Sequence, residues 1–277
     1  MQKAVPLVLT LVVVGFVVWA GFLKSPSKDQ APDMPGNTPK LADATPIKPN
    51  STSEINVPRP SDPAVAAAMD EILAAWDKVQ VVTAKVETLI PEAAGHKGRT
   101  DGKGDYYLQK NGAELLIHFY LFNELKIRKD EGTKLITGEV ISTTIDGKYN
   151  YTWLNQPSHR VASKDKLNYD DVLHIGGPYL FRDLVSNNQL SLLPEEMKDN
   201  RATKVFKAIP KEGSWESIHH FDKATGIRVE MVELDADGKP RLTIKLPQID
   251  TTTPINPEKF QFVVPEGFTF EDRTTTP

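Results

Sequence analysis

The feature that most constrains the fold is a run of eight residues that is apolar on both of its sides. Residues 115–122 read Leu-Leu-Ile-His-Phe-Tyr-Leu-Phe, and nearly every side chain is large and apolar. Side chains of a β-strand point alternately to opposite faces, so a strand of this composition faces water on neither side. Both faces of this strand must therefore be covered, either by packed elements or by a cavity that holds something apolar.

Short turns divide the rest of the chain into strands that pair with their neighbours. Asn111-Gly112 and Asp146-Gly147 are typical of two-residue hairpin turns, and Thr225-Gly226 and Asp237-Gly238 mark further reversals. In residues 82–88 apolar and polar side chains alternate, as a half-buried strand requires. Consecutive hairpins of this kind predict an antiparallel meander.

Helices are predicted at two places. Asp62-Pro63 resembles an N-cap followed by proline in the first turn, and apolar residues recur at helical spacing from there to Val79. Between Asn168 and Asn200, apolar residues are split by Gly176-Gly177-Pro178, which predicts two short helices that cover one face of the sheet. The chain is thus mainly β with some α.

The strands carry more apolar bulk than these few helices can shield. Each bulky residue alone is explained by a sheet core that is closed by helices, but together they favour a sheet curved around an apolar hollow. Alternation and bulk select the side chains that we expect to bind a ligand there: Leu115, Ile117, Phe119, Leu121, Tyr149, Tyr151, Trp153, Tyr179, Phe181, Trp215 and Phe221.

The first 62 residues predict a membrane anchor and a spacer. Residues 4–23 carry no charge, and a helix of that length spans a hydrocarbon core of about 30 Å. We expect residues 1–23 to be an uncleaved signal anchor, whereas cleavage near Val18-Trp19-Ala20 would release a secreted, soluble protein. Residues 24–62 hold eight prolines among polar residues and predict a disordered stalk. Residues 63–277 then form one domain, placed in the periplasm or otherwise outside the cytoplasm by a single membrane pass.

Composition excludes several classes of partner. The net charge of −4 comes from charges spread along the chain, so no basic field is present to hold nucleic acid. The sequence has no cysteine, which excludes disulfides, thiolate metal sites and cysteine nucleophiles.

No pattern of residues predicts catalysis. Gly102-Lys103-Gly104 is interpreted as a plain polar turn between strands, because no helix start follows it to bind a phosphate. His219-His220 are neighbours on a predicted strand and point to opposite faces, so they cannot share a metal ion. Glu195-Glu196 follow Pro194 and favour the N-terminus of a helix. We therefore expect a protein that is not an enzyme and has neither a metal site nor a cofactor.

The order of elements resembles a known family. The leading amphipathic helix and the meander are followed by Ile145-Asp146-Gly147-Lys148-Tyr149-Asn150-Tyr151-Thr152-Trp153, a helical insertion and further strands. The C-terminal part, with Phe221-Asp222-Lys223-Ala224-Thr225-Gly226 and Phe260-Gln261-Phe262-Val263-Val264-Pro265-Glu266-Gly267, adds to the likeness. Over roughly residues 64–272 the chain is similar to the LolA-like superfamily of bacterial lipoprotein carriers and sorting proteins.

That resemblance implies an unclosed barrel, made of a curved antiparallel sheet, with helices acting as a lid over a cavity for lipid acyl chains. The expected function is a tethered, non-enzymatic chaperone or sensor that binds a lipid acyl chain or a lipoprotein. The alternative is a protein-interaction or stress-sensor domain of the bacterial envelope, with an envelope protein as partner and a packed interior. Carriers of this family have an Arg-Pro pair in an early strand, and residues 106–112 have Lys110 and no proline.

Overall fold

The computed structural model describes residues 55–92, 98–112, 114–129, 132–156, 159–169, 172–213 and 215–274. Residues 55–170 and 174–277 form one compact unit, called the domain from here on. The predicted anchor and the predicted stalk up to residue 54 lie outside the described residues. In the part of the chain that is described, no helix is both long and apolar enough to cross a bilayer.

The first helix begins where its capping residues predict. Helix α2 spans Pro63–Asp77, and the carboxylate of Asp62 accepts a hydrogen bond from the Ala64 amide at 2.8 Å. Proline fits this first turn because it lacks the amide hydrogen that would have no partner there. The helix ends two residues before Val79, which is nevertheless buried.

The other elements are mainly strands. Their bounds are β1 (Val81–Ile90), β2 (Gly98–Asn111), β3 (Glu114–Lys129), β4 (Gly132–Asp146), β5 (Tyr149–Gln156), β6 (His159–Lys166), α3 (Gly177–Asn187), β7 (Asn188–Lys198), β8 (Arg201–Pro210), β9 (Ser217–Asp222), β10 (Arg228–Leu234), β11 (Pro240–Lys245), β12 (Ile249–Asp250), the 3-10 helix η2 (Pro257–Phe260) and β13 (Thr269–Asp272).

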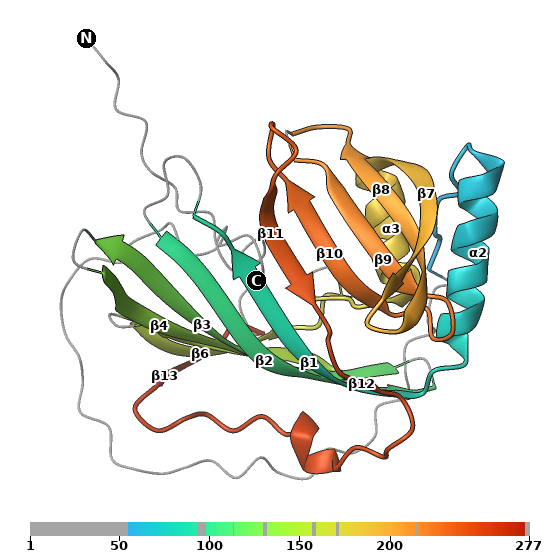
Figure 1. The fold of residues 1–277 in the computed structure, drawn as a ribbon. Coiled ribbons are helices and arrows are strands. Elements are labelled where there is room, and N and C mark those ends of the chain that lie inside the picture. The colour runs from blue at the N-terminus through green and yellow to red at the C-terminus, as the bar shows by residue number, and fades with distance from the viewer. Residues whose placement is uncertain are drawn as a thin grey trace. The chain divides into compact units, whose positions relative to one another are not determined.

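The described strands form one sheet of thirteen, in the order β13-β6-β5-β4-β3-β2-β1-β11-β10-β9-β8-β7, with β12 also paired to β1. Neighbours are antiparallel except β13 and β6, which run parallel. Because β13 and β7 stand at opposite ends of this order, the sheet is unclosed, and Figure 1 shows that it curves. The prediction of a mainly β domain with a curved antiparallel sheet is confirmed.

Strand β1 joins the two halves of this sheet. Along one edge it pairs with β2 from Val81 to Ile90. Along the other edge, residues 87–89 pair with β11 and residues 83–84 with β12, while the Lys85 amide donates to the Gln248 carbonyl at 2.9 Å. The seam between the halves is therefore short, and a single strand holds it.

The predicted turns are confirmed, and one more was missed. Gly112, Gly147, Gly226 and Gly238 all have positive φ angles, between 64° and 86°, which glycine adopts without steric cost. The turn between β7 and β8 instead uses residues 199–200, an Asp-Asn pair with φ angles of 47° and 61°. Aspartate and asparagine tolerate this left-handed conformation better than other residues with a side chain.

The prediction of two helices between Asn168 and Asn200 is wrong. Among the residues of this stretch that the structure describes, the one α-helix is α3, for which Gly176 is the N-cap, and the eleven-residue strand β7 follows it. Gly176-Gly177-Pro178 therefore starts a helix rather than separating two. Glu195 and Glu196 lie on β7 and cap no helix; Glu195 accepts hydrogen bonds from Lys223 instead.

The interpretation of residues 102–104 as a turn is also wrong. Both glycines lie inside β2, where the backbone of β3 comes very close to Gly104 and side chains of β1 and β3 come close to Gly102. A Cβ on Gly104 would stand 1.8 Å from the Tyr120 carbonyl oxygen, and one on Gly102 would stand 2.1 Å from the Thr88 hydroxyl. Glycine within a strand often marks such a close approach of two backbones.

The two helices pack on the half of the sheet formed by β7–β9. Phe181 of α3 stacks on Phe221 with 4.9 Å between ring centroids, and Phe206 meets both rings edge-on. Val57, from the segment predicted to be stalk, also packs on this cluster. The buried members are Val65, Ala68, Met69, Ile72, Leu180, Phe181, Leu184, Val185, Phe206, Ala208 and Phe221.

We predict that Gly226→Ala destabilises the domain much more than Gly238→Ala. Both glycines have a positive φ, which costs alanine roughly 1 kcal/mol. A Cβ on Gly226 would also lie 2.3 Å from the Ile72 carbonyl of α2, whereas Gly238 has open space there. Overpacking of this kind adds about 1–3 kcal/mol. Urea unfolding followed by tryptophan fluorescence measures the free energy of unfolding of both variants. An equal decrease in the two variants would contradict the docking of the Thr225-Gly226 turn on α2.

Candidate functional site

One face of the sheet, the inner face, is apolar across its first four strands. Residues opposite each other in antiparallel strands point to the same side. By this register Ala84 of β1, Tyr106 of β2 and Phe119 of β3 share a face, and Thr143 of β4 continues it. The inner face is defined by these residues.

The register carries the inner face across the seam to the helices. The connected residues are Thr88 of β1, Ile244 of β11, Met231 of β10, His219 of β9 and Phe206 of β8. Phe206 belongs to the cluster formed with α2 and α3. The helices therefore lie on the inner face, and the opposite face is called the outer face.

Six of the predicted ligand residues lie on the inner side. Phe181 and Phe221 belong to the helical cluster. The other four are Leu115, Ile117, Phe119 and Leu121, which alternate along β3. Ile117 and Leu121 are 0% exposed and Phe119 is 2% exposed, so water does not reach these side chains. In this structure the inner face is closed.

Three predicted residues lie on the outer face, so they cannot share a hollow with the first group. Tyr149, Tyr151 and Trp153 alternate along β5 and point away from the inner face. The C-terminal segment covers two of them: Phe262 stacks on Tyr151 at 4.8 Å, and Phe268 meets Trp153 edge-on at 5.5 Å. The outer face of these strands is thus packed by the chain itself.

The last two predicted residues lie elsewhere. Tyr179, near the start of α3, stacks on His174 with 5.0 Å between ring centroids. Trp215 is 41% exposed, and the guanidinium of Arg241 lies 4.2 Å from the centre of one of its rings. Trp215 therefore belongs to the surface.

The residue that sequence reasoning missed is Arg228, at the start of β10. It is 9% exposed on the inner face, where its side chain donates to His219 Nδ1 at 3.4 Å and to the His174 carbonyl at 3.0 Å. Its backbone amide donates to the Ile175 carbonyl at 2.6 Å. Burial lowers the pKa of the guanidinium to about 10, so Arg228 is still a cation at neutral pH.

A β-bulge explains why the sequence concealed this residue. Simple alternation in the run from Ile227 to Val232 would put Arg228 and Glu230 on one polar side. The register of β9 and β10 shifts between these two residues, so Arg228 lies opposite Phe221 while Glu230 lies opposite His220. Such a bulge redirects the side chains beyond it, and Arg228 thereby enters the interior. The Thr225-Gly226 turn signals a reversal but not the bulge.

The contacts of Arg228 determine the protonation of His219. A guanidinium has no acceptor, so His219 Nδ1 accepts its hydrogen bond and carries no proton. Nε2 then bears the ring proton and donates to the Ser217 hydroxyl at 2.8 Å. Burial, together with the charges of Arg228 and His220, holds the pKa of His219 well below its usual range. His219 is a neutral imidazole.

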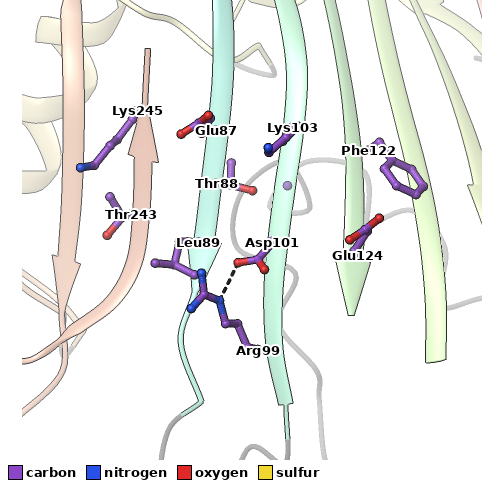
Figure 2. A pocket seen from close by; sticks show the side chains of 11 residues that line it. Glu87, Thr88, Leu89, Arg99, Asp101, Lys103, Phe122, Glu124, Thr243 and Lys245 are labelled. Atoms are coloured by element: carbon purple, nitrogen blue, oxygen red, sulfur yellow. Dashed lines mark hydrogen bonds and ion pairs between the residues drawn. The ribbon is translucent and has the colours of Figure 1, made fainter. Parts of the chain in front are cut away.

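The outer face holds a charged groove of about 540 Å³ (Figure 2). A row of charges alternates across four strands beneath it, because Lys103 lies opposite Glu87, Glu87 opposite Lys245, and Lys245 opposite Glu230. Lys245 Nζ stands 3.0 Å from a Glu230 oxygen. The other lining residues are Thr88, Leu89, Arg99, Asp101, Gly102, Phe122, Glu124 and Thr243.

The row ends in a buried cluster around Glu230 and His220. Burial raises the pKa of Glu230, but hydrogen bonds from Lys198 and Lys245 outweigh it, so the pKa lies below its usual value. Lys198 Nζ is 2.8 Å from Glu230, and His220 Nε2 is 3.3 Å from Glu196. His219 and His220 thus contact different groups on opposite faces, as predicted.

No protein-family model matches this chain, and no curated protein matches it. Solved structures with a similar fold include the Pseudomonas aeruginosa MucA/MucB complex (15% identity, 72% of this chain and 62% of that chain, TM-score 0.36). They also include an uncharacterized conserved protein from Thermus thermophilus (11% identity, 76% of this chain and 99% of that chain, TM-score 0.42). A LolA superfamily protein from Nitrosomonas europaea is a further example (11% identity, 70% of this chain and 98% of that chain, TM-score 0.26). The chain covers 64% of the MucB chain in a crystal structure of MucB. LolA superfamily proteins and lipoprotein-sorting domains are thus among the solved structures to which this chain is similar.

We predict that acid destabilises the domain through His219. Its pKa is depressed in the folded state, so its contribution is fully present above the unfolded pKa of about 6.5 and is lost as the pH falls below it. The free energy of unfolding falls by up to about 1.4 kcal/mol per pH unit as long as His219 takes up no proton in the folded state. Urea unfolding between pH 7.5 and pH 5 measures this slope, which should be shallower in His219→Gln. An unchanged slope would contradict the neutral, buried imidazole.

Proposed function

We propose that the domain is a non-enzymatic binding module that holds a lipid acyl chain, free or attached to a lipoprotein, against its inner face. The observation that carries the proposal is the continuous apolar surface of that face on β1–β4. Val82, Leu108, Ile117 and Ile145 lie there beside Phe119, and each is at most 2% exposed. Each methylene that leaves water for such a surface gains about 0.8 kcal/mol.

The closed inner face means that binding requires opening. The cover on this side includes α3, which begins at Gly176-Gly177 with no side-chain cap and follows a loop from β6. Both glycines lie against Trp76, where a Cβ would stand 2.3–2.6 Å from the indole. A helix reached through two glycines is suited to act as a lid, because glycine permits the backbone rotations that such a movement needs. An acyl chain of about fifteen methylenes gains roughly 12 kcal/mol, which offsets such an opening.

The place of action follows from the N-terminal sequence. An uncharged stretch over residues 4–23 and a proline-rich stalk would hold the domain outside the cytoplasm at a membrane surface. Retained there, the module would act as a chaperone or sensor within reach of its stalk, because the tether confines it.

A second function is supported by the outer face. The groove of Figure 2 combines acidic and basic side chains in a regular row, and the inner face is closed in this structure. A surface of alternating charges suits a polar peptide of complementary charge. The domain would then bind an envelope protein through this groove and keep its interior packed.

We predict that lipid binds the domain at the inner face. The domain beginning at Ile55 should release lipid on organic extraction, detected by mass spectrometry, and oleate should displace a fluorescent fatty acid from it. Phe119→Asn should weaken oleate binding at least tenfold by placing an amide on the apolar face. Tyr120→Asn is the matched control, because Tyr120 is the next residue of β3 and points to the outer face. Absence of both lipid and displacement would exclude the acyl-chain function.

The outer-groove function predicts a contact at Phe122. A photo-crosslinking amino acid at this position, which lines the groove, should form an adduct of one defined mass in intact membranes. Lys103→Glu should reduce that adduct because it breaks the alternation of charge. A crosslinker at exposed Val263 serves as the control position. Equal labelling from both positions, unaffected by Lys103→Glu, would argue against a specific protein partner in the groove.

A further inference from the structure

We propose that Arg228 binds the anionic head group of the ligand, which makes the ligand an amphiphile with one negative charge. This inference rests on the proposed acyl-chain function. It adds that the inner face binds the charged head group of the ligand as well as its hydrocarbon chain. The carboxylate of a fatty acid is the simplest group of this kind, and a phosphodiester is another source of the same charge.

The first argument is that Arg228 is a buried cation without a carboxylate. Its hydrogen-bond partners, His219 and the His174 carbonyl, are neutral, and no acidic side chain of the described residues forms an ion pair with it. Burying an isolated charge is costly, so buried charges in proteins are normally paired. The two buried carboxylates among the described residues follow that rule.

Glu230 and Asp222 show the contrast. Glu230 has Lys198 at 2.8 Å and Lys245 at 3.0 Å, and Asp222 has Arg201 at 3.2 Å. All three of these basic side chains are more exposed than Arg228. The domain therefore pairs these buried charges and leaves the cation on the inner face without a counter-charge.

The second argument is the position of Arg228 beside the apolar surface. Arg228 and Tyr106 are both buried on the inner face, and the ring centroid of Tyr106 lies 6.3 Å from that of Phe119. From Phe119, the inner side chains of β3 continue along the strand to Leu121 and Ile117. An amphiphile with its head at Arg228 would thus have its chain on the surface assigned to the acyl group.

The third argument is that the loop leading into α3, the proposed lid, accepts hydrogen bonds from Arg228. The guanidinium donates to the His174 carbonyl, the Arg228 amide donates to the Ile175 carbonyl, and Gly176 forms a bridge with Ile227. All three contacts come from the loop that leads into α3. A movement of this loop uncovers the inner face and frees the donors of Arg228 in one step. A charged oxygen then replaces a neutral carbonyl, which adds the attraction between opposite charges in a site of low dielectric to the hydrogen bond.

The neutral His219 sets the charge that the site accepts. Because its Nδ1 accepts from Arg228, the pair carries a single positive charge. One cation in a site of low dielectric matches a monoanion, whereas a phosphate monoester would bring a second, uncompensated charge.

The test compares oleate, lysophosphatidylglycerol and the uncharged oleyl alcohol as competitors for a fluorescent fatty acid. The full chain, held in an amphipathic polymer without detergent, should bind both anions at least tenfold more tightly than the alcohol. Arg228→Gln should remove this preference and change the affinity for oleyl alcohol less than threefold. Arg241→Gln, on the next strand and facing Trp215, should leave the preference unchanged.

A second readout keeps the test valid if Arg228→Gln folds poorly. The carboxyl carbon of ¹³C-labelled oleate reports its own titration by NMR. Its pKa should be lower when oleate is bound to the unmodified chain, or to Arg228→Lys, which keeps the cation, than when oleate is dispersed in neutral phospholipid vesicles. A pKa as high as that in vesicles, or equal affinity for the anions and the alcohol, would overturn the assignment of Arg228 while the acyl-chain function stands. Failure of all three amphiphiles to bind would overturn both.

Discussion

Strand β1 is the constraint on which the rest of the domain depends. It pairs with β2 along one edge, and with β11 and β12 along the other, so every residue from Thr83 to Leu89 lies between the two halves of the sheet. Because its alternate side chains are buried on the inner face, a slip of one residue in its pairing would move the apolar side chains of β1 to the outer face. The seam thereby aligns the strand that carries Tyr106 with the strand that carries Arg228.

The doubly apolar strand β3 obtains its two covers from different parts of the chain. On the inner side Ile117, Phe119 and Leu121 are at most 2% exposed, and on the outer side Tyr120 contacts Trp153, which the C-terminal Phe268 covers. The C-terminal segment also adds β13 to the edge of β6, so one segment shields both an aromatic surface and a sheet edge. Aromatic bulk that suggested a ligand site on β5 serves this internal packing instead.

The charges of the domain divide between the two faces in a way that bears on function. The outer face has a row of charges of alternating sign, in which Lys245 pairs with Glu230, whereas the inner face has the buried cation Arg228 with neutral hydrogen-bond partners. Paired charges are already compensated and contribute mainly to specificity, but an uncompensated buried cation favours an incoming anion. The geometry thus connects the acyl-binding proposal with a definite chemical preference.

The sequence by itself determined the features that depend on neighbouring residues: the capped helix at Asp62, the glycine turns and the alternation along β1 and β3. Tertiary structure decided the rest. The run after α3 became a strand because it pairs with β8, Tyr151 was covered by a segment about a hundred residues away, and a bulge turned Arg228 inward. Local side-chain chemistry restricts backbone angles, whereas the face on which a residue lies, and what covers it, are set by pairing with distant strands.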